Sequence, residues 1–102
     1  MIADVASRRD ELRDLCSRFG VRRLDLFGSA ARGDFDPAQS DLDFLYEFEP
    51  KPPGGYAEAF FGLKESLELL FGRPVDLVAA AAIRNPYFRE SVEETRVPLY
   101  AA

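Results

Sequence analysis

The central feature of this sequence is a pair of short apolar runs separated by a polar loop. The first, residues 24 to 27, stops at Gly28-Ser29, and the second, residues 41 to 48, alternates polar and apolar side chains. Strand side chains alternate between two faces, so the second run predicts a strand. One face would carry Asp41, Asp43, Leu45, Glu47 and Glu49, and the other Leu42, Phe44, Tyr46 and Phe48. Asp41 and Asp43 would then have Cα atoms roughly 6.6 to 6.8 Å apart, within reach of one metal ion or two neighbouring ions.

Gly28-Ser29 lies where the first strand should end and one helical turn, residues 29 to 32, should begin. Unpaired amides at such a point favour an anion, and glycine lets the backbone approach a phosphate closely. An isolated Gly-Ser is more simply a strand-to-helix turn with Ser29 as the N-cap. The acids that follow are what favour phosphate binding.

The combination resembles the DNA polymerase beta-like nucleotidyltransferase superfamily, and most closely its minimal nucleotidyltransferase (MNT) branch. The motifs that carry the resemblance are Gly28-Ser29, Ala31-Arg32-Gly33, Ser40-Asp41-Leu42-Asp43 and Val75-Asp76-Leu77-Val78. They span nearly the whole chain. The spacer of residues 30 to 40 is slightly longer than the family pattern, a departure that concerns the loop's conformation rather than the acids.

The resemblance implies a nucleotidyltransferase fold, two Mg²⁺ ions and ATP as the substrate. Asp41 and Asp43 would hold both ions, and Asp76 would bind the ion that activates the acceptor hydroxyl and would receive its proton. Three carboxylates at one site repel each other, so without cations at least one should keep its proton above the usual pKa of about 4. The alternative reading is a solvent-exposed strand face for Asp41 and Asp43, and an edge residue for Asp76.

Gly28, Ser29 and Arg32 are the predicted nucleotide-binding residues, and Arg73 is a weaker triphosphate candidate. Each arginine could equally form a structural ion pair. Ser40 could orient Asp41 or simply end the loop. Residues 84 to 88 (RNPYF) could form a partner-binding edge, although aromatic residues at helical spacing more often belong to a core.

The predicted activity is transfer of AMP from ATP onto a hydroxyl, with release of pyrophosphate. The resemblance implies that the acceptor is a tyrosine of a HEPN-family ribonuclease toxin, for which this chain would be the antitoxin. A second hypothesis is a non-catalytic antitoxin that neutralises its partner by occlusion. A third, an enzyme that modifies small molecules such as aminoglycosides, is disfavoured because few residues remain to form an acceptor pocket.

The overall composition narrows these hypotheses. With 102 residues, we expect a single domain over residues 1–102, too small for a separate substrate-reading domain. A net charge of −5 disfavours direct binding to nucleic acid. The chain has no histidine, which removes histidine acid–base catalysis. A lone Cys16, with no leader and no long apolar run, favours a cytoplasmic protein that does not enter a membrane.

Periodicity predicts the remaining elements. We expect helices over residues 4–19, 56–71 and 86–96, the first capped by Asp4 and the last by Asn85, and a helical turn over 79–83. Strands are predicted over residues 21–27, 41–48 and 75–78, with a short edge strand at 97–100. The fold class is therefore α/β (α+β), a small mixed sheet flanked by helices. Its exposed edge would permit a homo- or hetero-oligomer.

Overall fold

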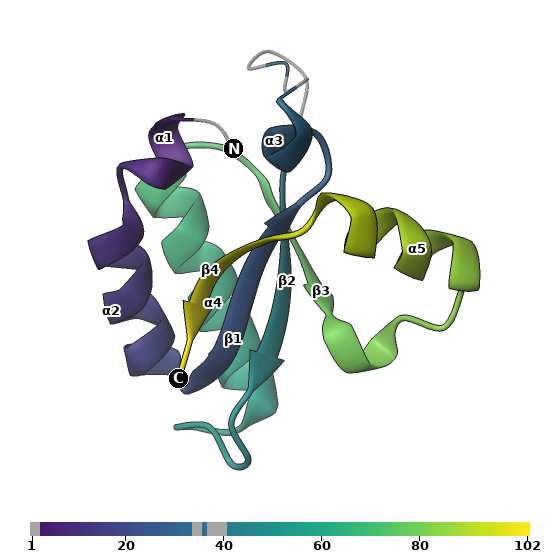
Figure 1. Cartoon of the computed structure of the whole chain (residues 1–102). Coiled ribbons are helices and arrows are strands. Elements are labelled where there is room, and N and C mark those ends of the chain that lie inside the picture. Colours follow the sequence, from purple (N-terminus) through teal and green to yellow (C-terminus); the bar gives the residue numbers. More distant parts are fainter. Residues whose placement is uncertain (1–2, 34–35, 37–40) are drawn as a thin grey trace.

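The computed structural model describes residues 3–33, 36 and 41–102. Within them, one mixed sheet has the strand order β3-β2-β1-β4 (Figure 1). Strand β1 pairs antiparallel with both β2 and β4, whereas β2 and β3 are parallel. The strands are β1 (Val21–Phe27), β2 (Leu42–Phe48), β3 (Val75–Ala79) and β4 (Val97–Ala101). The predicted small mixed sheet with flanking helices is confirmed.

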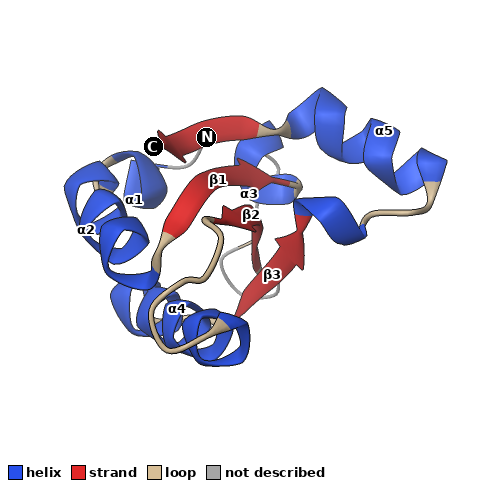
Figure 2. Cartoon of the chain, turned by 90° about the horizontal axis from the view of Figure 1, so that it is seen from below, coloured by secondary structure: helices blue, strands red, loops and turns tan. Residues whose placement is uncertain are grey.

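Helices cover the two faces of this sheet unequally (Figures 1 and 2). Helices α1, α2 and α4 lie along one face, while α5 and the short 3-10 helix η1 lie on the other side. Helix α3 sits at the end of the sheet where β1 finishes. The helices are α1 (Ala3–Ala6), α2 (Arg9–Phe19), α3 (Ser29–Arg32), α4 (Tyr56–Phe71), η1 (Ala80–Ala82) and α5 (Pro86–Thr95).

The main core fills the space between the sheet and helices α1, α2 and α4. The apolar face of β2 points into it, as its alternation predicted, and Leu42 and Phe44 are fully buried there. The helices contribute Val5, Leu12, Leu15, Cys16, Leu63 and Leu67. This layer removes most of the apolar surface from water, and so anchors β2 in one register.

A second, smaller core lies on the other face of the sheet. It joins Phe27 and Leu45 to Ile83, which follows η1, and to Val92 of α5. Leu45 lies on the acidic face of β2 but is only 4% exposed, because this cluster covers it. That face therefore divides into a covered part and an end that carries the acids.

The single helix predicted over residues 4–19 is wrong, because the chain breaks it at Ser7 and Arg8. The Ser7 hydroxyl donates to the Asp4 carbonyl at 3.1 Å, and the Arg8 amide donates to the Val5 carbonyl at 3.1 Å, a tighter turn than an α-helix. Asp4 consequently lies inside α1 rather than capping a longer helix. Val5, Leu12, Leu15 and Cys16 are nevertheless buried, as expected from their helical spacing.

Individual residues explain where α4 ends, where α5 begins and why β4 tolerates a proline. Gly72 ends α4 in the left-handed conformation, and the Asn85 side chain caps α5 by accepting hydrogen bonds from the amides of Tyr87 and Phe88. Pro98 lies in edge strand β4, where its missing amide is tolerated. None of the helices in the described residues has the length and apolarity needed to cross a bilayer.

Candidate active site

The predicted acids meet where β1 ends and where β2 and β3 begin. In the sheet register Asp43 is paired with Phe27 on one side and with Asp76 on the other. Neighbouring strands lie about 4.8 Å apart, so the Asp43 and Asp76 side chains emerge next to each other on one face. Asp41 precedes β2 by one residue and is exposed. Asp41 and Asp43 thus share one end of the sheet with Asp76, which is 33 residues further along the chain than Asp43.

Gly28 brings the backbone of the predicted phosphate turn against this acidic pair. Its φ of +74° and ψ of −153° lie in a region that other residues rarely adopt. A Cβ atom at this position would collide with Oδ2 of Asp43, which leaves no room for a side chain. The Gly28 carbonyl accepts hydrogen bonds from the amides of Ala31 and Arg32, at 3.1 and 3.0 Å, which closes α3 directly after the turn.

Electrostatics couple the same residues. Burial, followed by repulsion from Asp76 and Asp41, raises the pKa of Asp43 to about 6, and the nearby Arg32 lowers it by a smaller amount. The pKa of Asp43 is raised, as expected for a carboxyl among other acids, although burial contributes more than repulsion. Asp76, Asp41 and Arg32 all lie near enough to Asp43 to influence its charge.

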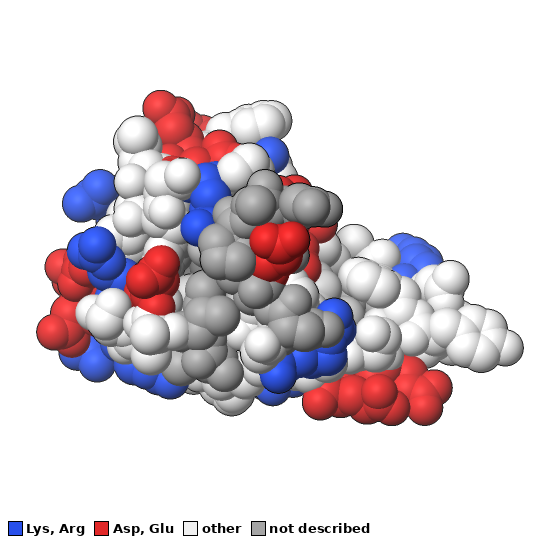
Figure 3. Space-filling view, turned by 90° about the horizontal axis from the view of Figure 1, so that it is seen from above, with Lys and Arg blue, Asp and Glu red and all other residues white. Residues whose placement is uncertain are grey.

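The donor set fits a hard divalent cation. Carboxylate oxygens are the ligands that Mg²⁺ prefers, and a cation would offset the repulsion that raises the pKa of Asp43. In the described part of the chain, no three acidic or cysteine side chains are gathered closely enough to hold an ion without rearrangement. Asp43 and Asp76 are adjacent in the sheet register. Seen from the α3 end, acidic atoms lie near the middle of the molecule with basic atoms around them (Figure 3).

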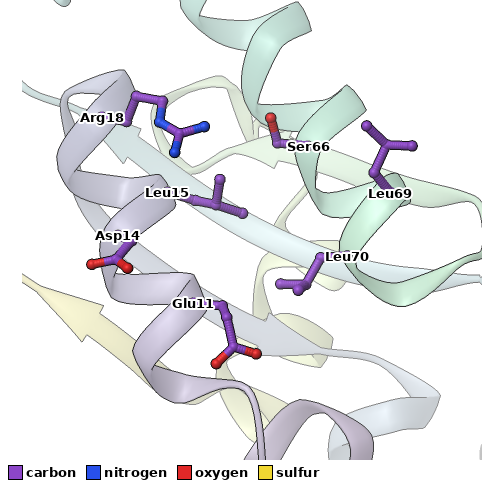
Figure 4. Close-up of a pocket in the computed structure, with 7 residues that line it drawn as sticks. All are labelled: Glu11, Asp14, Leu15, Arg18, Ser66, Leu69 and Leu70. Atoms are coloured by element: carbon purple, nitrogen blue, oxygen red, sulfur yellow. The ribbon is translucent and has the colours of Figure 1, made fainter.

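A groove in the described part of the chain lies elsewhere. It has a volume of about 410 Å³ and runs between α2 and α4, with Leu15 and Leu70 inside and Glu11, Asp14 and Arg18 along α2 (Figure 4). These helices cover the face of the sheet opposite the acids. The groove is therefore separate from the candidate active site.

The structure places the other predicted residues as follows. Arg73 precedes Pro74, whose carbonyl accepts a hydrogen bond from the Leu42 amide, so Arg73 lies at the acidic end of the sheet. Ser40 lies outside the described residues. In the RNPYF segment, Phe88 packs edge-on against Phe27 with ring centroids 6.1 Å apart, whereas Tyr87 is 81% exposed. Packing thus accounts for Phe88 but not for Tyr87.

Two groups beside the site were not predicted. The Gly28 amide donates a 3.3 Å hydrogen bond to Thr95 Oγ1 at the end of α5. Asp25, in the middle of β1, is fully buried and accepts hydrogen bonds from Arg96. A carboxylate between Leu24 and Leu26 was a visible signal for Asp25, whereas nothing in the local sequence marked Thr95.

Comparisons with known proteins agree with this geometry. The sequence profile of the nucleotidyltransferase domain family matches residues 9–99. Protein adenylyltransferase MntA of Thermococcus cleftensis is 38% identical over 81 residues, which are 79% of this chain and 75% of the relative. A solved structure provisionally described as a minimal nucleotidyltransferase superposes with a TM-score of 0.74 at 37% identity, covering 92% of this chain and 91% of that one.

A more distant likeness is to a structure of a tri-AMPylated Shewanella oneidensis HEPN toxin in complex with an MNT antitoxin. The TM-score is 0.63 at 16% identity, over 96% of this chain and 73% of that one, so the likeness shows the fold alone. The family assignment rests instead on the profile, which matches most of the chain, and on the relatives of higher identity. The chain therefore belongs to the nucleotidyltransferase domain family and is a nucleotidyltransferase.

Proposed function

We propose that this chain transfers AMP from ATP onto a hydroxyl of a partner protein, and that the partner is a HEPN-family toxin that it neutralises. The observation that carries the proposal is the pairing of Asp43 with Asp76, with Gly28 against Asp43 and Asp41 one residue before β2. The Thermococcus relative named a protein adenylyltransferase supports the reaction class. The MNT–HEPN complex of shared fold supports the kind of partner.

In this reaction the acceptor oxygen forms a bond to the α-phosphorus of ATP. The bond from that phosphorus to the bridging oxygen breaks, and pyrophosphate leaves with the electron pair. Asp76 accepts the proton of the acceptor hydroxyl, while Ser29 and Arg32 bind the phosphates. Asp41 and Asp43 would hold Mg²⁺, which would supply positive charge to stabilise the attacking and leaving oxygens.

A tyrosine is the acceptor that we propose. Its hydroxyl stands at the end of a long rigid side chain, and the exposure of Asp41 and Asp76 leaves them accessible to such a side chain from a partner. The partner would provide much of the acceptor pocket, because the groove between α2 and α4 lies on the opposite face of the sheet. Tyr87, exposed on α5 beside Phe88, is a candidate contact for that partner.

The test is the intact mass of the partner toxin after co-expression with the native chain or with the Asp41→Ala, Asp43→Ala double variant. We expect a mass increase of one or more AMP units with the native chain alone, and peptide mapping would place it on a tyrosine. A stable complex without any mass increase, formed equally by both versions, would instead favour neutralisation by occlusion.

A further inference from the structure

Thr95 connects the end of α5 to the predicted nucleotide-binding turn. Its Oγ1 accepts the hydrogen bond from the Gly28 amide at 3.3 Å, across a sequence separation of 67 residues. The same hydroxyl lies 3.1 Å from the Ser91 carbonyl and 3.4 Å from the Val92 carbonyl in the preceding turn of α5. A hydroxyl has one proton and two lone pairs, so it can donate to the helix and accept from Gly28 at the same time.

The residues after Thr95 fix its position relative to β1. Arg96 donates from Nε to Oδ2 of the buried Asp25 at 2.8 Å, and its Nη2 lies 2.5 Å from the same oxygen. Val97 then begins β4 and is paired with Leu26 of β1. Thr95 is thus held by α5 on one side and by two contacts to β1 on the other.

Gly28 is the point where a small displacement would matter most. Its backbone lies so close to Asp43 that no Cβ atom fits, and its carbonyl closes α3. Without an acceptor at Thr95, the Gly28 amide would have no partner among those described for it. A partly buried amide without a partner is unfavourable, so the turn would move towards one.

We propose that Thr95 is a positioning residue, which holds Gly28 so that the turn and the acids keep the spacing needed to bind the nucleoside triphosphate. This proposal rests on the proposed function of the turn as the nucleotide-binding element. Thr95 acts through Gly28 and needs no contact with the nucleotide. It extends the site to the end of α5, which none of the motifs that carry the family resemblance includes.

The test compares the native chain with Thr95→Val, which keeps the shape of the side chain but removes the hydroxyl, and with Thr95→Ser, which keeps the hydroxyl. The affinity for ATP with Mg²⁺ is measured by calorimetry, beside the melting temperature of the ligand-free protein. We expect Thr95→Val to weaken ATP binding about tenfold, the effect of one ordinary hydrogen bond, and Thr95→Ser to restore it. A purely structural residue would lower the melting temperature and leave the ATP affinity of the folded protein unchanged, which would overturn the proposal.

Hydrogen exchange of the Gly28 amide, followed by NMR without nucleotide, separates this proposal from the proposed function. We expect protection in the native chain and in Thr95→Ser, and faster exchange in Thr95→Val. Equal exchange rates of the Gly28 amide in all three proteins would contradict the proposal that Thr95 positions the turn. Suppose that hydrogen exchange of the Gly28 amide was as expected but the native chain bound no ATP. The nucleotide-binding role of the turn and the positioning role of Thr95 would then both be wrong, although the hydrogen bond between Thr95 and Gly28 would be supported.

Discussion

Two carboxylates on neighbouring strands, Asp25 and Asp43, share one face of the sheet and have opposite surroundings. Asp25 is fully buried, and Arg96 and Arg23 both reach its Oδ2 atom. Asp43 is paired with Asp76, and burial and acidic neighbours raise its pKa to about 6. The fold therefore neutralises one acid with arginines and surrounds the other mainly with acids. Asp25 is therefore a structural ion-pair partner, whereas the acidic surroundings of Asp43 support the proposal that it meets a cation.

The largest expected effect comes from removing the charge of Asp43. In Asp43→Asn we expect the rate of AMP transfer to fall by at least roughly a thousandfold, because losing a direct metal ligand should exceed the 10–100-fold cost of losing an outer partner. The native fold should persist, since the change relieves repulsion from Asp76. The measurement is incorporation of labelled AMP into the partner, with circular dichroism to confirm folding.

The matched control for this variant is Asp10→Asn on α2. The Asp10 side chain is 89% exposed and has only a 3.7 Å ion pair with Arg13, so both activity and stability should stay near the native values. Asp43→Asn with full activity would remove Asp43 from the catalytic site. A loss in both variants would point to an effect of net charge instead.

The opposite behaviour is expected at the neutralised acid. Arg96→Met should lower the free energy of unfolding by about 3 kcal/mol, because it leaves the buried Asp25 without its principal partner. Arg23→Met should cost less than about 1 kcal/mol, because the Arg23 side chain is 44% exposed and 3.4 Å away. Urea denaturation measures both values.

A double variant tests whether this cost comes from the unpaired charge. Asp25→Leu added to Arg96→Met removes the carboxylate together with its partner, and should recover part of the lost stability. If the double variant were less stable than Arg96→Met alone, packing around Arg96 rather than the charge of Asp25 would explain the loss. That outcome would weaken the contrast between the two acids.

Substitutions of two glycines can separate the effect of the close approach of Gly28 to Asp43 from the effect of a positive φ angle. Gly28→Ala should lower AMP transfer strongly and cost about 2 kcal/mol of stability, since it combines a positive φ with a Cβ atom that would collide with Asp43 Oδ2. Gly33→Ala is the control, because Gly33 has a φ of +96° but a Cβ atom added there would meet no atom of the described residues within 4 Å, its chain neighbours apart. We expect Gly33→Ala to cost about 1 kcal/mol and to keep most of the activity. Equal losses of activity would show that only the backbone conformation matters.

Local patterns predicted much of this architecture and site because local chemistry decides those features. The alternation of residues 41 to 48 predicted both faces of β2, whereas the grouping of Asp76 with Asp43 was implied by the family resemblance and not by local spacing. The break at Ser7 could not be predicted, since it depends on a side-chain hydrogen bond that competes with the helix. The contacts of Asp25 with Arg96 and of Gly28 with Thr95 join residues about 70 positions apart, and only the folded chain brings them together.

The smallest effect concerns the pH dependence of stability in the absence of divalent cations. The pKa of Asp43 is about 6 in the folded state and near 4 when unfolded, so the folded chain binds this proton more tightly. The contribution of protonated Asp43 is fully present below pH 4 and is lost as the pH rises through about 6. The native chain should therefore lose stability relative to Asp43→Asn between pH 4 and pH 6, by about 1 to 2 kcal/mol after solvent screening.

Urea denaturation of both proteins across this range isolates the effect of Asp43, because both proteins contain all the other carboxylates. Addition of Mg²⁺ should restore part of the native stability above pH 6. If the difference in free energy of unfolding between the two proteins were constant from pH 4 to pH 7, the pKa of Asp43 would not be raised in the folded state.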